Sequence, residues 1–138
     1  YPHPIYIRFS AGNDPIVSRP PFEIDKACVM KIGRRALVIT TGITLTQAMA
    51  VDDVTVLHCP TVKPLDKDAV LKYASKVPVV ITIEEHNLVG GLGDAVSNLG
   101  IPVKKIGIPN VYVDRYGTQE RLMKYYGITT EAIENAIK

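Results

Sequence analysis

One stretch of the chain, residues 79–96, constrains the fold more than any other. It begins with the mostly β-branched run Val79–Ile83 and continues into the polar run Glu84–His86. A glycine cluster follows at Gly90–Gly93, and apolar residues then recur at helical spacing over Leu92–Leu99. This order predicts a buried parallel strand with a polar cluster at its carboxyl end, followed by a tight turn into a helix. In open α/β sheets, ligands and partner domains meet at that edge.

Strand and helix patterns alternate along most of the chain. Strands are expected at residues 36–41, 54–58, 79–83 and 103–108, and helices at 44–50, 66–77, 92–99, 118–126 and 130–137. This alternation predicts βαβ units, and therefore an α/β fold with a parallel sheet and helices on both faces. A β-hairpin arm of residues 22–24 and 27–32 is expected to add an antiparallel edge strand.

The first part of the chain has a different composition. Residues 5–9 are strand-like, whereas residues 10–21 are rich in Gly, Pro, Asn and Asp and predict a loop or linker. The chain begins at Tyr1 without an initiator Met or a signal-peptide pattern. Because a strand pattern follows almost at once, we expect a fragment cut inside or just after a preceding domain.

Composition excludes several classes of protein. The chain is 46% hydrophobic and 22% charged, with a formal net charge of +2. That charge is scattered and too small to indicate nucleic-acid binding, and no apolar run approaches the roughly 20 residues of a membrane span. Cys28 and Cys59 lie in apolar runs without metal-ligand spacing. They are expected to be buried thiols in a reducing, cytoplasmic compartment, with a disulfide or a metal as the alternative.

The glycine cluster at Gly90, Gly91 and Gly93 allows two interpretations. A helix that begins there could bind a phosphate through its free amides. However, Val96 occupies the last glycine position of the G-x-G-x-x-G dinucleotide motif, so that motif is not matched. The pattern favours glycines that permit a tight turn and close helix–sheet packing.

The polar run Glu84, Glu85 and His86 could in principle form an acid–base or metal site. Successive strand residues point to opposite faces, so Glu84 and Glu85 cannot both reach one centre while the strand continues. The sequence has no second His at ligand spacing, no G-x-S-x-G and no Walker motif. We therefore assign no catalytic, cofactor-binding or metal-ligating residue. Glu84, Glu85, His86, Gly90, Gly91 and Gly93 are predicted to serve an interface or domain packing.

Several segments, taken in order, resemble the C-terminal region of transketolase-like, thiamine-diphosphate-dependent enzymes. They are Ile5–Phe9, Ala36–Gly42, Val62–Asp66, Val80–His86 with Gly90–Gly93, and the tail Tyr126–Ile133. The resemblance covers essentially the whole chain. The forms K-P-L-D and E-E-H are more similar to the deoxyxylulose-phosphate synthase and split-transketolase branches than to the beta subunits of keto-acid dehydrogenases.

The resemblance implies a three-layer α/β/α domain on a five-stranded mixed sheet with one antiparallel strand. It further implies a transferase that moves a ketol or aldehyde residue, in which this domain is structural and not catalytic alone. Thiamine diphosphate and Mg²⁺ would be held by the N-terminal and middle domains of the parent enzyme, whose G-D-G motif is absent here. Those domains and a second copy, in a homodimer, are the implied partners.

Arg8 matches the first arginine of the family pattern R-Y-P-R-G and is the candidate substrate-binding residue. The second arginine, which contacts substrate phosphate in the family, is replaced by Ala11. The helix after Gly42 is also shorter than in the family. The implied organisation is residues 1–12 as the end of a preceding pyrimidine-binding domain, 13–21 as a linker and 22–138 as the C-terminal domain. The alternative is a free-standing α/β binding module that pairs with a partner subunit or binds a small anion at Gly90–Gly93.

Overall fold

One mixed sheet of five strands organises the molecule. The computed structural model describes residues 2–9, 16–17 and 22–138. The strands are β1 (Cys28–Lys31), β2 (Leu37–Thr40), β3 (Thr55–His58), β4 (Val80–Asn87) and β5 (Lys104–Ile108). Their order is β1-β3-β2-β4-β5, and only the edge strand β1 runs antiparallel to its neighbour. The predicted mixed sheet with one antiparallel edge strand is therefore confirmed.

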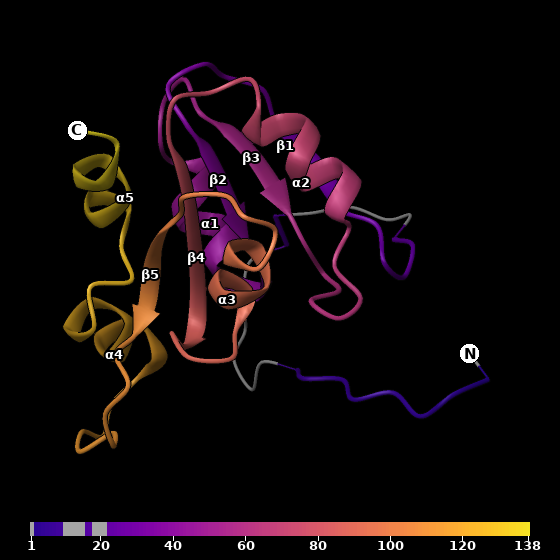
Figure 1. Ribbon diagram of the computed structural model, residues 1–138. Helices are drawn as coiled ribbons and strands as arrows, with labels where there is room; N and C mark the ends of the chain where they lie inside the picture. The colour runs from indigo at the N-terminus through magenta and orange to yellow at the C-terminus, as the bar shows by residue number, and fades with distance from the viewer. Residues whose placement is uncertain (1, 10–15, 18–21) are drawn as a thin grey trace.

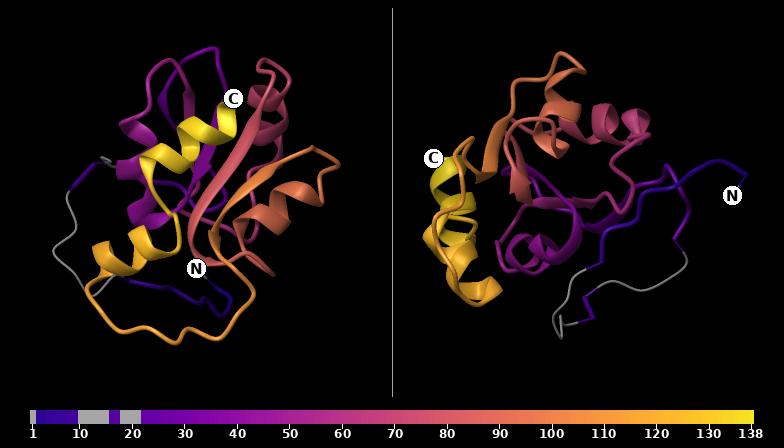
Figure 2. Two further views of the ribbon diagram at one scale, coloured as in Figure 1. Left: turned by 90° about the vertical axis from the view of Figure 1, so that its left-hand side faces the viewer. Right: turned by 90° about the horizontal axis from the view of Figure 1, so that it is seen from below.

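Helices cover both faces of the sheet. They are the 3₁₀ turn η1 (Gly42–Thr44), α1 (Leu45–Met49), α2 (Lys67–Ala74), α3 (Leu92–Ser97), α4 (Gln119–Tyr125) and α5 (Thr130–Ile137). Figure 1 shows α2 and α3 on one face, and Figure 2 shows α1, α4 and α5 on the other. The predicted three-layer α/β/α arrangement is confirmed.

Alternate strand residues supply two separate apolar cores. Val38, Val56 and Ile81 pack toward α1, α4 and α5, together with Met123 and Ile133. Their neighbours along the strands pack toward α2 and α3, and the buried members of that second core are Leu37, Ile39, Leu57, Cys59, Val70, Val80, Leu92 and Val96. Strands that are buried on both faces must be apolar at nearly every position, which is why these segments read as continuous hydrophobic runs.

A polar side chain fixes where one helix begins, and a glycine fixes where another ends. The Asp66 carboxylate caps α2 by accepting from the Ala69 amide at 3.0 Å, and it also accepts from the Ala27 amide at 3.0 Å. Gly127, at φ +70°, lies in the left-handed conformation that ends α4. Thr44 ties the turn after β2 to β4, because its hydroxyl donates to the Ile83 carbonyl at 2.9 Å. Both predicted helix boundaries, at Asp66 and Gly127, are thus confirmed.

Two predicted strands are not formed. Residues 5–9 adopt no strand, and residues 22–24 do not pair with 27–32, so the predicted hairpin is wrong. The pairing partner of β1 is β3, from Cys28 opposite His58 to Lys31 opposite Val56. A β-branched or aromatic run becomes a strand only where the backbone of a neighbouring strand supplies hydrogen bonds. Within the described residues, neither segment lies beside such a strand partner.

Part of the predicted linker and Ala11 lie outside the described residues. Ile16 and Val17, the two linker residues that the structure describes, form no helix or strand and are exposed. Within the described residues, no helix has the length and apolar character needed to cross a bilayer.

The turn before β2 leaves no room for a side chain at Gly33, which generates the first prediction. A Cβ atom there would lie 2.2 Å from the Asp53 carbonyl carbon, whose oxygen accepts from the Arg34 and Arg35 amides at 3.0 and 2.9 Å. We expect Gly33→Ala to lower the free energy of unfolding by about 1–3 kcal/mol, since overpacking of this size displaces the backbone. Urea unfolding measures the effect.

The matched control is Gly117→Ala. Its added Cβ atom would lie 3.6 Å from its nearest neighbour, Arg121 Cβ, which is ordinary contact. This variant should unfold at nearly the wild-type urea concentration. Equal midpoints for the two variants would contradict the role given to Gly33.

Candidate functional site

The carboxyl end of β4 directs its two glutamates to opposite faces of the sheet, as the strand period predicts. The Glu84 side chain is only 1% exposed and points toward α3. Its two oxygens accept from the amides of Leu92 at 2.7 Å and Gly93 at 2.8 Å. Glu84 therefore caps α3 from the neighbouring strand, because the N-cap residue Gly91 has no side chain to do so.

At each glycine of the cluster, a different geometric constraint disfavours a side chain. A Cβ atom at Gly91 would lie 2.1 Å from Glu84 Oε2, and one at Gly93 would lie 2.8 Å from Lys105 Cδ. Gly90 adopts φ +79°, a conformation that L side chains rarely take. The interpretation of the cluster as a tight turn with close helix–sheet packing agrees with this geometry.

Three of the four amides that a small anion would need are already used. Besides the two that donate to Glu84, the Gly90 amide donates to Asp94 Oδ2 at 2.6 Å, and Lys105 Nζ contacts Asp94 Oδ1. The hydrogen bond from Gly90 and the ammonium of Lys105 hold the pKa of the Asp94 carboxyl below its usual value. The protein's own carboxylates thus occupy three of the four amide donors of the suggested anion site at Gly90–Gly93, which speaks against anion binding there.

Glu85 lies on the other face and binds two distant parts of the chain. Gln119, the first residue of α4, donates through Nε2 to both carboxylate oxygens, at 3.1 and 3.0 Å. Arg8 donates through Nη1 to the Glu85 carbonyl at 2.9 Å, and its Nη2 lies 3.8 Å from Glu85 Oε2. The structure thus brings Arg8 to Glu85. Gln119 was not among the predicted site residues, because it lies 34 residues from Glu85 and belongs to no motif.

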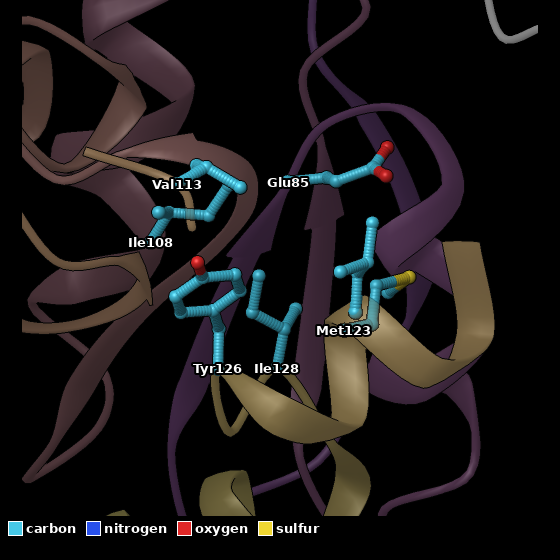
Figure 3. Close-up of a pocket in the computed structure, with 7 residues that line it drawn as sticks. Glu85, Ile108, Val113, Met123, Tyr126 and Ile128 are labelled. Carbon is cyan, nitrogen blue, oxygen red and sulfur yellow. The ribbon is translucent and has the colours of Figure 1, made fainter. Parts of the chain in front are cut away.

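A small apolar pocket adjoins Glu85. It is lined by Glu85, Ile108, Val113, Leu122, Met123, Tyr126 and Ile128. Figure 3 shows the Glu85 carboxylate pointing away from Ile108 and Val113, and the Tyr126 hydroxyl pointing toward them. That hydroxyl is buried and has no hydrogen-bond partner among the residues that the structure describes. His86 is exposed beside this edge, and its Nδ1 lies 3.0 Å from the Asn87 carbonyl oxygen.

Two of the described titratable side chains, Cys59 and His58, are buried. Burial raises the pKa of the Cys59 thiol to about 12 and lowers the pKa of the His58 imidazole, so both are neutral at pH 7. Among the residues that the structure describes, no three His, Cys, Asp or Glu side chains could hold a metal ion together. The described side chains therefore supply no three-ligand cluster for the Mg²⁺ of a diphosphate.

Of the residues predicted to serve an interface or domain packing, Glu84, Gly91 and Gly93 are buried within the domain itself. Glu85 is half-buried, whereas His86 and Gly90 are exposed. The exposed surface of this edge thus includes Glu85, His86 and Gly90, and it is available for contact with another domain.

Comparison with known proteins identifies the family. Residues 25–133 match the family described as the C-terminal domain of transketolase. The chain belongs to the transketolase C-terminal domain family. A transketolase family protein of Sinorhizobium fredii is 32% identical to it, over 98% of this chain and 44% of that protein. The 1-deoxy-D-xylulose-5-phosphate synthase of Pseudomonas aeruginosa strain PAO1 is 34% identical, over 96% of this chain and 23% of the synthase.

A solved structure agrees with these sequence relatives. This transketolase C-terminal domain superposes on a chain titled "Split gene transketolase, inactive beta4 tetramer" with a TM-score of 0.82 and 28% identity. The match covers 90% of the present chain and 45% of that chain. The resemblance seen in the sequence is confirmed, and the domain spans less than half the length of these relatives.

The capping role of Glu84 in this transketolase C-terminal domain generates the second prediction. In Glu84→Gln, the side-chain amide presents a donor toward one of the two backbone amides, which leaves that amide buried and unpaired. We expect the free energy of unfolding to fall by about 1.5–3 kcal/mol, the contribution of a hydrogen bond to a charged group. Urea unfolding measures the loss.

The matched control is Glu85→Gln, which alters the next residue on the other face of β4. Since Glu85 is partly exposed and its ion pair with Arg8 is long, this change should cost less than about 1 kcal/mol. Equal urea midpoints for the two variants would contradict the capping role of Glu84.

The buried thiol generates the third prediction. At pH 8, a thiol of pKa about 12 is ionised roughly a thousand times less often than one of pKa 9.0. In a Cys28→Ser variant, which leaves Cys59 as the one thiol of the chain, iodoacetamide should react at least a thousandfold more slowly in the folded protein than in urea. Mass spectrometry follows the alkylation, and comparable rates in both conditions would refute burial of Cys59.

Proposed function

We propose that this chain is the assembly domain of a transketolase-like, thiamine-diphosphate-dependent transferase and is inactive alone. The observation that carries the proposal is the use of the carboxylates at the carboxyl edge of the sheet. Glu84 caps α3, Asp94 pairs with Lys105, and Glu85 is bound by Gln119 and Arg8. Groups that are all engaged in structural contacts suit an architectural role.

The family membership supports a reaction for the parent enzyme. That reaction would transfer a two-carbon ketol unit or condense a decarboxylated keto acid with an aldehyde, on thiamine diphosphate and Mg²⁺ held by other domains. In this proposal residues 1–12 end a pyrimidine-binding domain, residues 13–21 form a linker and residues 22–138 form the assembly domain. Arg8 then lies where the two domains meet. Ala11, at the phosphate-binding position of the family, lies outside the described residues.

Partners and location follow from the same proposal. The preceding domains, in the same polypeptide or in a separate subunit, and a second copy in a homodimer would cover the edge around Glu85 and His86. The two free cysteines support a reducing compartment such as the cytoplasm.

A second candidate is a free-standing binding module that pairs with a partner subunit. It is favoured by the solved neighbour, whose title describes a split-gene protein. The start of the reading frame distinguishes the two candidates. A frame that continues upstream of Tyr1 into a G-D-G-bearing domain supports the first, and a start codon near Tyr1 supports the second.

The fourth prediction tests whether the cofactor is bound by other domains of the parent enzyme and not by this chain. Isothermal titration of thiamine diphosphate with Mg²⁺ into the isolated chain should give no saturable heat, because the chain carries neither the G-D-G motif nor a described metal-ligand cluster. The positive control is the full-length protein, which should bind the cofactor and transfer a ketol or aldehyde unit. Micromolar binding by the isolated chain would overturn the proposal.

A further inference from the structure

Residues 5–9 are held to the domain in an unusual way. The segment has no helix or strand, and its apolar side chains are exposed: Ile5 by 51%, Tyr6 by 89%, Ile7 by 60% and Phe9 by 83%. Figure 1 shows the amino-terminal trace running clear of the sheet and its helices. Apolar burial therefore does not explain why the segment lies where it does.

Arg8 supplies the attachment. Its guanidinium donates to the Glu85 main-chain carbonyl at 2.9 Å, and its second terminal nitrogen lies 3.8 Å from the Glu85 carboxylate. One planar group thus contacts both the backbone and the side chain of a single residue. This two-point contact fixes the direction from which the segment approaches β4.

Gln119 holds the receiving carboxylate in place. Its side-chain amide nitrogen lies 3.1 and 3.0 Å from the two Glu85 oxygens, and the Glu85 side chain is only 26% exposed. Gln119 is itself fixed as the first residue of α4, after the N-cap Thr118. Three parts of the chain that are distant in sequence therefore meet at one carboxylate: the amino-terminal segment, the end of β4 and the start of α4.

We propose that Arg8, Glu85 and Gln119 form an interdomain latch that joins this domain to the domain in front of it. Ile7 and Phe9 flank Arg8 in the sequence and take no part in its contacts with Glu85. Ile7 is 60% and Phe9 83% exposed, so their apolar surface is not used by this domain and is suited to the core of the preceding domain. The identity of that domain rests on the proposed function, whereas the contact among the three residues does not.

The test measures docking of the segment in the full 138-residue chain. A nitroxide on Glu120→Cys, in a Cys28→Ser background, lies next to the latch and broadens NMR signals of nearby amides. In the otherwise unchanged chain the amides of residues 6–9 should be strongly broadened. Arg8→Ala and Glu85→Ala should each raise the undocked population about three- to fivefold, as expected for a partly exposed ion pair. Because Arg8→Ala removes both contacts and Glu85→Ala leaves the carbonyl that Arg8 also contacts, the double variant should be no worse than Arg8→Ala alone.

Two further variants sharpen the result. Glu85→Gln removes the charge and keeps the side-chain shape, so it gives the same direction of change if Glu85→Ala fails to fold. Arg34→Ala removes an exposed arginine that lies 3.9 Å from Asp53, and it should leave the broadening unchanged. Unchanged broadening in Arg8→Ala, or additive effects in the double variant, would overturn the latch.

The full-length enzyme tests the interdomain part of the proposal. There, Arg8→Ala and Glu85→Ala should separate the thermal transition of this domain from that of the preceding one, while Arg34→Ala should not. A single unchanged transition in both latch variants would overturn the interdomain role. An enzyme that lacks transferase activity but keeps this behaviour would instead contradict the proposed function and leave the latch supported.

Discussion

The buried carboxylate of Glu84 joins β4 to α3, and much of the local architecture depends on it. An unpaired charge inside a protein costs several kcal/mol, so Glu84 is tolerable only because two backbone amides satisfy its oxygens at 2.7 and 2.8 Å. Those amides exist as donors because they begin a helix. The same approach of helix to strand excludes a Cβ atom at Gly91, which is why a glycine precedes Leu92.

Much of the fold could be predicted because hydrophobic patterns report burial directly. The runs around β2, β3 and β4 are apolar at successive positions, and that pattern occurs where a parallel sheet is covered on both faces. The strand period also placed Glu84 and Glu85 on opposite faces. The errors at residues 5–9 and 22–24 have one cause: strand propensity is visible in a sequence, but a pairing partner is not. Gln119 was not predicted as a site residue for a related reason, since only the tertiary fold brings it to Glu85.

The polar groups of the candidate site are used in contacts within the domain. A glycine-rich turn at the start of a helix beside two glutamates suggests anion binding or acid–base chemistry when read locally. In the folded chain the turn amides face internal carboxylates, and burial keeps Cys59 and His58 neutral. The domain therefore uses a polar sheet edge for cohesion, in agreement with a family in which it forms less than half of the longer proteins that contain it.

The opposite orientations of Glu84 and Glu85 restrict how this segment can change length. Deleting or inserting one residue within β4 would rotate the strand's faces by half a period. Glu85 or Ile83 would then face the α3 amides, and the displaced glutamate would lie against Met123 and Ile128 in the apolar core around α4 and α5. The packing of both apolar cores, one on each face of the sheet, would be disrupted. Length variation among homologous chains is therefore expected in the turns on either side of β4, and the spacing from Val80 to Glu85 should stay fixed.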